Sequence, residues 1–340
     1  MNWKHVDVVA FGGPENLHLV EETALPEPQP GQVRVKVLTA GTGFTDTIIR
    51  KGQYPYVKTN PPFTLGYDWF GMVDKAGADA TTFKVGDYVA DMPRIGGYAQ
   101  YLCADADRLV PCPTGLDPVA AVCMILSYTT AYQMLTRECS LKKGDAILVH
   151  AAGGAVGTAL LELGRLMGFK VYGTASKGKH AVVNALGATP IDYHSEDFVA
   201  RTLSLSPGGV QAVFDPIGGR NWARSYRCLA RGGKLVSFGA QQVVTGEEKI
   251  PAVLMGYFKL FVLWKLFPDN KQTSFYDIQK CRDKNPDQFR LDLQALMNLL
   301  AQGKLHPVVA NIEPLERAAE VHRRIDNAEI AGRVVLRCNP

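Results

Sequence analysis

A glycine-rich segment, Ala151-Ala152-Gly153-Gly154-Ala155-Val156-Gly157, stands between an apolar run at 146–150 and a helix-like stretch at 155–167. Small residues at this point let the backbone approach a pyrophosphate closely, and the start of a helix offers the anion unpaired N–H groups and a positive dipole end. A glycine pattern alone is weak, but a strand before it and a helix after it strengthen it considerably. The segment therefore predicts a dinucleotide site, with a tight strand-to-helix turn that binds no ligand as the alternative.

The residues after the next predicted strand indicate which dinucleotide binds. An NAD site usually places an acidic residue there, where it holds the ribose 2′-hydroxyl. No acidic residue occurs between Glu162 and Asp192, and the chain instead reads Ser176-Lys177-Gly178-Lys179-His180. Hydroxyl and ammonium groups suit a 2′-phosphate, which carries about −1.5 to −2 charges. We therefore predict NADPH rather than NADH; the alternative is that these lysines are the solvated start of a helix.

The elements that must position these residues differ along the chain. The first 120 residues are rich in Gly and Pro, and the run at 33–37 alternates apolar and polar residues as a half-buried strand does. We predict no helix of convincing length before residue 118. The stretch 118–135 has helical composition, and beyond it strand and helix signals alternate, which predicts βαβ units and a parallel sheet. The predicted strands there are 146–150, 170–174, 212–215 and 234–238, and a last strand at 332–336 can rejoin the first domain.

Length and composition limit the class of protein. The 340 residues suggest about two domains. The net charge of +4 is too small and too diluted to indicate a nucleic-acid partner or an anionic membrane. Polar residues interrupt the N-terminus before an apolar stretch forms, so we expect no signal peptide. The most apolar segment, 257–267, contains two lysines and is shorter than the roughly 20 residues that span a bilayer, so we expect no transmembrane helix.

The cysteines and histidines predict neither a disulfide framework nor a metal site. The seven cysteines, at 103, 112, 123, 139, 228, 281 and 338, form no CxxC pair, and their number is odd. This pattern indicates reduced thiols and a cytoplasmic compartment. The histidines are scattered without the pattern of a metal site or a catalytic triad. We interpret His150, at the end of the strand before the glycines, as structural.

A set of short motifs extends over nearly the whole chain. They are Gly66-Tyr67-Asp68 with Gly71, Val85-Gly86-Asp87-Tyr88-Val89, Gly96-Gly97-Tyr98-Ala99-Gln100-Tyr101, Tyr128-Thr129-Thr130-Ala131-Tyr132, Leu148-Val149-His150-Ala151-Ala152, Ile191-Asp192-Tyr193, Asp215-Pro216-Ile217-Gly218-Gly219 and Gly232-Gly233-Lys234-Leu235-Val236. Together they resemble the medium-chain dehydrogenase/reductase superfamily, and within it the zinc-free quinone oxidoreductase and enoyl reductase branch that includes ζ-crystallin-like proteins. No single motif would be specific.

The resemblance implies an α/β protein of two domains with a cleft between them. A GroES-like, mostly β catalytic domain is expected at residues 1–122 and 308–340, and a Rossmann NADPH-binding domain with a doubly wound parallel sheet at 123–307. In relatives of this family, the strand expected at 273–276 lies at a dimer edge, so we predict a homodimer.

The resemblance also gives single residues a role in binding NADPH. The residues that match the pyrophosphate loop are Gly154, Ala155, Val156 and Gly157. The residues that match positions near the 2′-phosphate or adenosine are Ser176, Lys179 and Tyr193, and those near the nicotinamide and its ribose are Thr130, Ile217, Phe238 and Gly239. The alternatives are that Tyr193 is ordinary surface and that Phe238 is part of the core.

The zinc alcohol dehydrogenases that the chain resembles need a cysteine where Gly43 stands and a histidine where Tyr67 stands. Neither residue suits a tetrahedral zinc site, so we predict no metal. Without a Lewis acid, hydride delivery to an already electrophilic acceptor is easier than oxidation of an unactivated alcohol. The zinc-free branch commonly has Asn at position 43 in an Asn-x-x-Asp pattern, and this chain keeps only Asp46. That loss leaves the orientation of the substrate open.

Two tyrosines are candidate catalytic residues. Tyr54 matches a family tyrosine near the site, and its phenol can hydrogen-bond a carbonyl oxygen or relay a proton. Tyr67 is the second candidate, because its position faces the zinc site in relatives. The alternative for Tyr54 is an aromatic wall without a chemical role. A further segment, 251–267, is aromatic and apolar. We expect it to line a hydrophobic pocket and contact a dimer partner; contact with a membrane surface and a plain core helix are the alternatives.

These predictions favour an NADPH-dependent, zinc-free oxidoreductase that transfers hydride to a quinone or an α,β-unsaturated carbonyl. Its substrate would be a small, hydrophobic electrophile. One alternative is an enoyl reductase for a single metabolite. Another is a weakly catalytic or non-catalytic NADPH-binding protein of the crystallin-like, RNA-contacting or vesicle-associated type, which the missing asparagine mildly supports.

Overall fold

The structure is a computed structural model that describes residues 2–244, 246 and 250–339. It divides into two units, Met1–Thr129 with Arg290–Pro340, and Thr130–Phe289. The boundaries predicted from the sequence were 122/123 and 307/308. Residues 118–123 belong with the first unit because their helix packs on its sheet, and residues after 289 do so because the Arg290 guanidinium donates to the Asp107 carbonyl oxygen at 2.6 Å.

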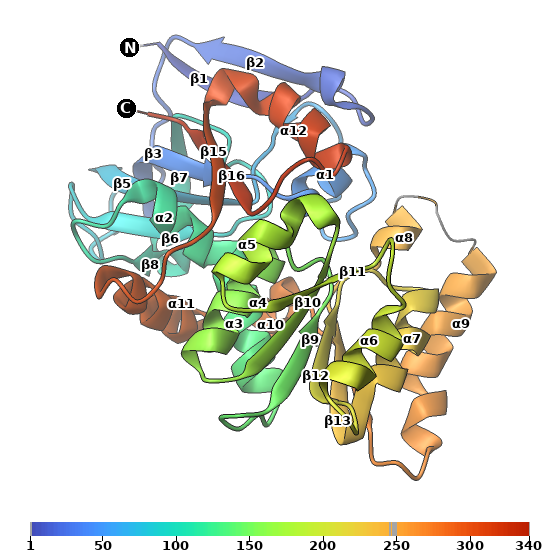
Figure 1. Cartoon of the computed structure of the whole chain (residues 1–340). Coiled ribbons are helices and arrows are strands. Elements are labelled where there is room, and N and C mark those ends of the chain that lie inside the picture. The colour runs from blue at the N-terminus through green and yellow to red at the C-terminus, as the bar shows by residue number, and fades with distance from the viewer. Residues whose placement is uncertain (1, 245, 247–249, 340) are drawn as a thin grey trace. The chain divides into compact units, whose positions relative to one another are not determined.

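The first unit is mostly antiparallel β-structure (Figure 1). One sheet has the order β2-β1-β4, and the other has the order β15-β16-β3-β5-β6-β8 with β7 paired to β3. The strands are β1 (Trp3–Val8), β2 (Leu17–Glu22), β3 (Gln32–Gly41), β4 (Phe63–Thr64), β5 (Asp68–Ala76), β6 (Tyr88–Asp91), β7 (Tyr101–Asp105), β8 (Val110–Pro111), β15 (Val309–Pro314) and β16 (Arg333–Arg337). The helices are α1 (Phe44–Arg50), α2 (Pro118–Cys123), most of α11 (Pro286–Ala301) and α12 (Ala318–Asp326).

Alternating hydropathy forms the central strand of this unit. The odd-numbered residues of the predicted strand 33–37 are buried, and the residues between them are only partly buried. The strand extends further than predicted, to Gly41, because it pairs with β5, β7 and β16. The predicted C-terminal strand does rejoin this unit, as β16. Helix α1 was not predicted, since its two turns are too short to give a periodic pattern.

The second unit is a six-stranded, fully parallel sheet with the order β11-β10-β9-β12-β13-β14 and helices on both faces (Figure 1). This confirms the predicted alternation of strands and helices and the doubly wound fold. The strands are β9 (Ala146–Val149), β10 (Lys170–Ala175), β11 (Thr189–Asp192), β12 (Val210–Asp215), β13 (Leu229–Ser237) and β14 (Gln272–Phe275). The helices are α3 (Thr129–Gln133), α4 (Ala155–Leu166), α5 (His180–Ala185), α6 (Phe198–Leu205), α7 (Arg220–Cys228), α8 (Gln241–Val244), α9 (Ile250–Phe261) and α10 (Ile278–Lys284).

The helix predicted at 118–135 is continuous from Pro118 to Glu138, with two wider π-helical stretches at Met124–Tyr128 and Met134–Glu138. By length and composition it is the one helix among the described residues that reaches the size of a membrane span. However, 78% of its most apolar window is buried inside the protein, which is the burial of a core helix.

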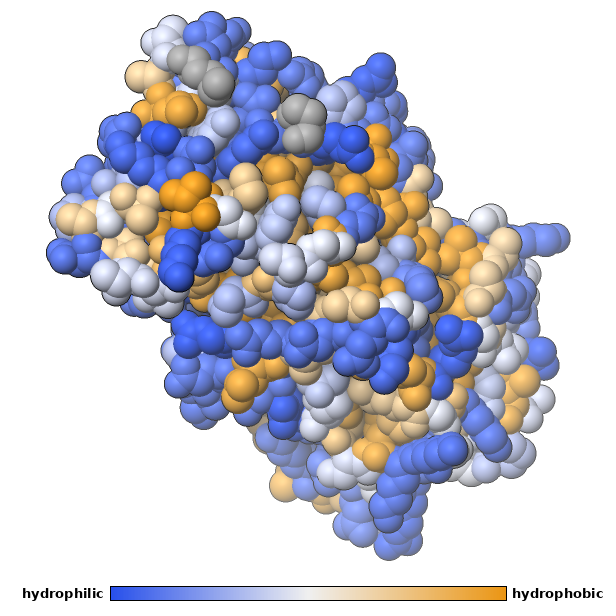
Figure 2. Space-filling view, turned by 90° about the vertical axis from the view of Figure 1, so that its left-hand side faces the viewer, coloured by the Kyte–Doolittle hydropathy of each residue, from blue (hydrophilic) through white to orange (hydrophobic). Residues whose placement is uncertain are grey.

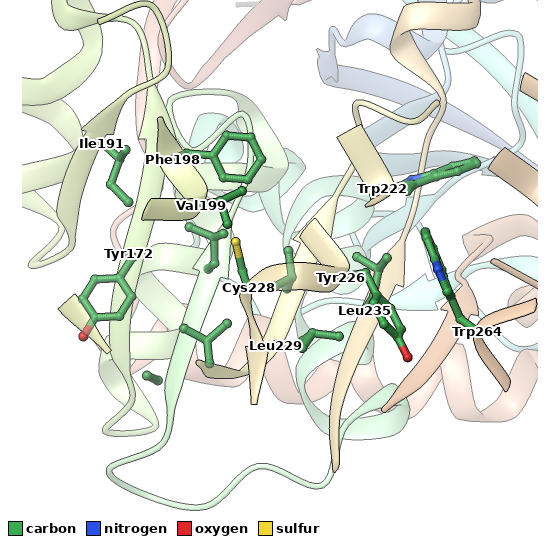
Figure 3. Close-up of a cluster of buried hydrophobic side chains, with 14 of the residues drawn as sticks. Tyr172, Ile191, Phe198, Val199, Trp222, Tyr226, Cys228, Leu229, Leu235 and Trp264 are labelled. Carbon is green, nitrogen blue, oxygen red and sulfur yellow. The ribbon is translucent and has the colours of Figure 1, made fainter. Parts of the chain in front are cut away.

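The face of the molecule in Figure 2 carries hydrophilic and hydrophobic residues side by side, as is ordinary for a folded protein. The core of the second unit is a cluster drawn from its strands and from α6, α7 and the segment after α9 (Figure 3). Trp264 stacks on Tyr226 at 4.6 Å between ring centroids. The apolar segment 251–267 is therefore anchored in the core by some of its residues, including Leu260 and Trp264.

Candidate functional site

The glycine-rich segment lies between β9 and α4, as predicted from the sequence. Gly154 precedes the first helical residue with extended backbone, and Ala151 has a φ of 51°, in the left-handed region. A Cβ at Gly157 would collide with the Ala151 carbonyl and the Ala152 backbone, so only glycine lets the start of the helix close against this turn. The first N–H groups of α4 are thereby available to an anion at the end of the sheet.

The structure places Lys179 against the glycine-rich segment. A Cβ at Gly153 would meet the aliphatic part of the Lys179 side chain, so the two are in close contact. Burial lowers the pKa of the half-buried Lys179 ammonium from its usual value. This lysine can offer a positive charge beside a bound pyrophosphate or ribose phosphate.

Ser176 and Tyr193 follow neighbouring strand ends. In the parallel pairing of β10 and β11, Ala175 is opposite Asp192, and each predicted residue comes next in the chain. Ser176 is half-buried and Tyr193 is 51% exposed. Both are therefore accessible at the edge of the sheet where an adenosine ribose would lie in this fold.

The predicted nicotinamide-side residues gather at the ends of β12 and β13, with one exception. The backbone N–H of Phe238 donates to the Asp215 carbonyl oxygen at 3.2 Å. Gly239 lies so close to Pro216 that a Cβ would approach its carbonyl oxygen to 2.9 Å. Ile217 follows Pro216, so these residues form one rim of the sheet. Thr130 belongs to another element, α3.

Thr130 has a buried hydroxyl that needs a partner. The residue is 5% exposed, and its Oγ1 has no hydrogen-bond partner within the described part of the chain. A buried hydroxyl left unpaired is costly and is expected to meet a ligand or water. Together with the glycine turn and the adjacent lysine, this hydroxyl fits a dinucleotide, whose carboxamide could pair with it.

A buried network that the sequence did not reveal supports the rim. The Asp215 carboxylate accepts the backbone N–H groups of Ile217 at 2.7 Å and Gly218 at 3.2 Å. It also accepts the Ser225 hydroxyl at 2.6 Å, and the Ser225 Oγ lies 3.0 Å from His150 Nε2. Because that hydroxyl donates to the aspartate, this is not the arrangement of a hydrolase triad. The motif 215–219 was the available signal, but Ser225 lies outside it.

His150 is a structural residue, as the sequence suggested. Its ring is 2% exposed, and its other nitrogen lies 2.9 Å from the Thr174 hydroxyl. Burial lowers the pKa of His150, which favours the neutral imidazole. The residue therefore links the end of β9 to β10 and to the middle of α7, directly before the glycine-rich segment.

The two predicted catalytic tyrosines form a pair in the first unit. Their hydroxyl oxygens lie 2.6 Å apart, so one donates a hydrogen bond to the other. Tyr67 is 1% exposed, whereas Tyr54 is half-buried. Their rings meet edge to face, with centroids 5.8 Å apart. Tyr54 is thus the outer member of the pair and Tyr67 the inner one.

Asp46 fixes the backbone around this pair. Its carboxyl oxygens accept the N–H of Tyr67 at 3.0 Å and the N–H of Gly43 at 2.9 Å. Burial, together with the nearby Asp68 carboxylate, raises the pKa of Asp46 to about 8. Asp68 is itself paired with the buried Arg333 guanidinium, whose charge partly opposes the rise in the pKa of Asp46. The remaining half of the family's Asn-x-x-Asp pattern therefore positions Tyr67.

The described residues provide no group of three or more His, Cys, Asp or Glu side chains placed to hold a metal ion. At the two positions where zinc enzymes need ligands, the chain has Gly43 and the hydrogen-bonded Tyr67. A Cβ at Gly43 would meet only the Asp46 carboxylate, at 3.7 Å, so space remains beside it. Burial raises the pKa of Cys123 to about 12, which removes it as a thiolate ligand or nucleophile.

Comparison with protein families matches two parts of the chain. Residues 29–114 match a family model described as alcohol dehydrogenase GroES-like domain, and residues 186–336 match one described as zinc-binding dehydrogenase. The second description names a metal that the residues at positions 43 and 67 do not suit.

Curated relatives match over almost the whole chain. A synaptic vesicle membrane protein VAT-1 homolog of Danio rerio is 30% identical over 338 residues, which cover 98% of this chain and 69% of the relative. A quinone oxidoreductase of Lama guanicoe is 31% identical over 345 residues, covering 97% of this chain and 96% of the relative.

Solved structures agree with these relatives. A human synaptic vesicle membrane protein VAT-1 homolog-like protein has a TM-score of 0.85 at 25% identity and covers 100% of this chain and 99% of its own. The quinone oxidoreductase of Escherichia coli complexed with NADPH has a TM-score of 0.85 at 26% identity and covers 98% of this chain and 99% of its own.

Proposed function

Because the chain belongs to the medium-chain dehydrogenase/reductase superfamily, in the branch of the quinone oxidoreductases and VAT-1 homologues, we propose that it reduces quinones or α,β-unsaturated carbonyls with NADPH. The observation that carries this proposal is the glycine-rich segment 151–157, closed at Gly157 and flanked by Lys179, in a chain whose structural relatives include a quinone oxidoreductase complexed with NADPH.

The second unit binds and orients the cofactor. The N–H groups at 154–157 meet the pyrophosphate, and Ser176 and Lys179 meet the 2′-phosphate. The Thr130 hydroxyl, unpaired in the described part of the chain, meets the nicotinamide carboxamide. The rim of Ile217, Phe238 and Gly239 lies beside the nicotinamide ribose. When bound, NADPH supplies the hydride, and these groups hold it in place and exclude water.

The tyrosine pair supplies the proton. Hydride addition gives an enolate or a hydroquinone anion, and its oxygen takes the proton of the half-buried Tyr54 hydroxyl. Tyr67 donates to Tyr54 through the 2.6 Å hydrogen bond and so stabilises the phenolate that forms. Exchange with solvent at the outer hydroxyl then restores the proton. One hydride and one proton together convert a quinone to a hydroquinone.

Purified protein and a panel of quinones and enones test the proposal. The expected result is loss of NADPH absorbance with at least one quinone or enone, at a much lower cofactor concentration for NADPH than for NADH. The affinity for each nucleotide is measured separately, by titrating the fluorescence of NADPH or NADH with the protein. Tight NADPH binding without reduction of any member of the panel would refute the proposed reaction but keep the cofactor assignment. Equal affinity for NADH would overturn the role given to Lys179.

The exposed apolar residues in and after α9 indicate an interaction surface, which raises a second candidate function. Seven large hydrophobic side chains between Leu254 and Phe267 are 45% to 74% exposed. The four at 254, 255, 258 and 261 recur at the spacing of one face of α9, and the other three follow the end of that helix. The seven are Leu254, Met255, Phe258, Phe261, Val262, Leu266 and Phe267. Single exposed apolar residues are ordinary, but a group of this size marks an interaction surface.

Two occupants of this surface are compatible with the relatives. We favour a homodimer, because α9 packs beside β14, the edge strand of the parallel sheet, which can pair with a second copy. The second candidate is an NADPH-binding protein that docks on vesicle membranes through the same surface. Some relatives are named synaptic vesicle membrane proteins, and the segment also contains two cations, Lys259 and Lys265. The seven free thiols support a reducing, cytoplasmic compartment in either case.

Analytical ultracentrifugation and vesicle sedimentation separate these occupants. The dimer proposal expects Phe258→Ser to yield monomers and wild-type protein to remain in solution with anionic vesicles. A wild-type monomer that sediments with those vesicles, and that Phe258→Ser releases, would support the second candidate instead. Leu19→Ser, at an exposed apolar residue in the first unit, is the matched control.

A further inference from the structure

The loop after β6 is fastened to the segment that carries Tyr67. Four backbone N–H groups of the loop donate to carbonyl oxygens of residues 64–67. These are Arg94 to Tyr67 at 3.3 Å, Gly96 to Thr64 at 2.8 Å, Gly97 to Gly66 at 3.0 Å and Tyr98 to Leu65 at 2.7 Å. A Cβ at Gly66 would collide with Gly97 and Tyr98, so the two glycine motifs let the chains lie this close.

Arg94 has an unfavourable backbone conformation in this fastened loop. Its φ is 88°, in the left-handed region that side chains with a Cβ rarely adopt. The other non-glycine residues with positive φ in the described part of the chain have shorter side chains; they are Asp79, Ala151, Asn270 and Ala328. Such strain persists only where neighbouring contacts impose it, and it is concentrated at functional sites.

The Arg94 side chain lies over the ring of Tyr56, which is the neighbour of Tyr54 in the tyrosine pair. Its guanidinium carbon lies 5.4 Å from the centre of the Tyr56 ring. The Tyr56 ring in turn lies 5.6 Å from the Tyr54 ring, whose hydroxyl is bonded to Tyr67. One aromatic ring therefore separates a fixed positive charge from the proposed proton donor. Arg94 and Tyr56 are both half-buried, so the cation is partly shielded from water.

From this arrangement we infer that Arg94 binds an anionic group of the acceptor. A guanidinium presents a planar set of donors that matches a carboxylate or a phosphate, and partial burial strengthens such a pair. The acceptor is then a quinone or enone whose anionic group lies several bonds from its reducible carbonyl. While the carbonyl oxygen meets Tyr54, the anion meets Arg94. This inference rests on the proposed reduction of quinones or enones and names the substrate class.

Matched acceptors test the role of Arg94. One pair consists of a quinone with a carboxyalkyl side chain and its methyl ester, which differ in charge and not in the reducible ring; a phosphate-bearing analogue is the third acceptor. Steady-state kinetics with NADPH are measured for wild type, Arg94→Gln and Arg94→Lys. Lys58→Gln, which removes an exposed charge two residues from Tyr56, is the control.

Wild-type protein is expected to prefer the acid to the ester. Arg94→Gln should raise the KM of the acid about 10- to 100-fold, the usual size of a lost hydrogen bond to a charged group, while the ester, kcat and the KM of NADPH stay unchanged. Arg94→Lys should restore part of the preference, and Lys58→Gln should keep all of it. If Arg94→Gln raises the KM of the phosphate analogue alone, the anionic group of the acceptor is a phosphate rather than a carboxylate.

Two outcomes would overturn the inference. One is a wild-type enzyme that treats the acid, the phosphate analogue and the ester alike, and the other is an Arg94→Gln substitution that weakens the charged acceptors and the ester equally. Binding of the acid and the ester to the NADP⁺ complex is measured by calorimetry as well. The binding measurement tests the inference even if no acceptor is reduced. In that case the proposed reaction fails, but tighter binding of the acid than of the ester, abolished by Arg94→Gln, would still support the role of Arg94.

Discussion

Removing one hydroxyl at a time from the tyrosine pair distinguishes the proposed proton donor, Tyr54, from Tyr67, which stabilises the Tyr54 phenolate. Tyr54→Phe deletes the outer hydroxyl and the 2.6 Å hydrogen bond to Tyr67 but keeps both rings in edge-to-face contact. General acids contribute about 10²- to 10⁴-fold to a rate. We expect a loss of kcat near the lower limit, about 100-fold or roughly 2.7 kcal/mol, because the half-buried position of Tyr54 admits water as a substitute donor.

The inner hydroxyl should matter less for chemistry. Tyr67→Phe leaves Tyr54 in place and removes only the bond that stabilises its phenolate, so kcat should fall by a smaller factor than in Tyr54→Phe. Each variant loses one neutral hydrogen bond, which costs about 1 kcal/mol of the free energy of unfolding. The 340-residue protein should remain folded in both cases.

Single-turnover oxidation of NADPH, followed by stopped-flow absorbance at saturating acceptor, measures the chemical step directly. Fluorescence titration checks that the Kd of NADPH is unchanged, and urea denaturation measures the free energy of unfolding. Tyr56→Phe, a change of the same size in the neighbouring ring, is the control and should have little effect. If Tyr54→Phe reduces a good acceptor as fast as wild type does, Tyr54 is an aromatic wall and the proton comes from elsewhere.

Four further changes test other parts of the structure. Lys179→Met should weaken NADPH binding about 10- to 100-fold and leave NADH binding unchanged in a fluorescence titration, since only NADPH has the 2′-phosphate; a loss for both nucleotides would contradict the assignment. Ala151→Gly should raise the free energy of unfolding by about 1 kcal/mol, because glycine tolerates the φ of 51°; a lower urea midpoint would argue against this. Gly43→Asn should fold normally, as its Cβ meets only Asp46, and should lower kcat/KM for bulky quinones more than for small ones. In wild type, burial lowers the pKa of His322 to about 3 from 6.5, so the unfolded chain binds its proton first and stability should fall as pH drops below about 6.5. By about pH 4.5 this accounts for roughly 2.7 kcal/mol; in urea denaturation, His322→Gln should have a shallower pH dependence, and an unchanged slope would refute the assignment.

The local sequence predicted the elements whose hydropathy pattern repeats over several residues. The alternation at 33–37 and the apolar runs at 146–150 and 212–215 became strands of the expected sheets, as Gln32–Gly41, Ala146–Val149 and Val210–Asp215. The turn before α4 was also predictable, since Gly157 is required by contacts with residues 151 and 152, which lie within six positions of it. The two-turn helix α1 was missed, because seven residues are too few to establish a helical period.

The sequence predicted single residues of the candidate site but not the contacts between them. Motifs singled out Tyr54 and Tyr67, but no motif indicated that their hydroxyl oxygens lie 2.6 Å apart, across 13 positions of sequence. Ser225 could not be identified, because it meets His150 across 75 positions of sequence. Composition showed that segment 251–267 is apolar; only the fold separates its buried residues, such as Leu260 and Trp264, from the seven that are exposed.

The sequence by itself determined the fold class, the cofactor turn and the absence of suitable zinc ligands at positions 43 and 67, because each depends on residue types at fixed and short spacing. The tertiary structure decided which side chains meet. Strand pairing and loop closure placed Arg94 beside Tyr56, Lys179 against Gly153, and Asp46 beneath Tyr67. Such contacts join residues that are distant in the chain. Hydrogen bonds and packing depend on distances of a few ångströms in space, and separation along the sequence does not reveal those distances.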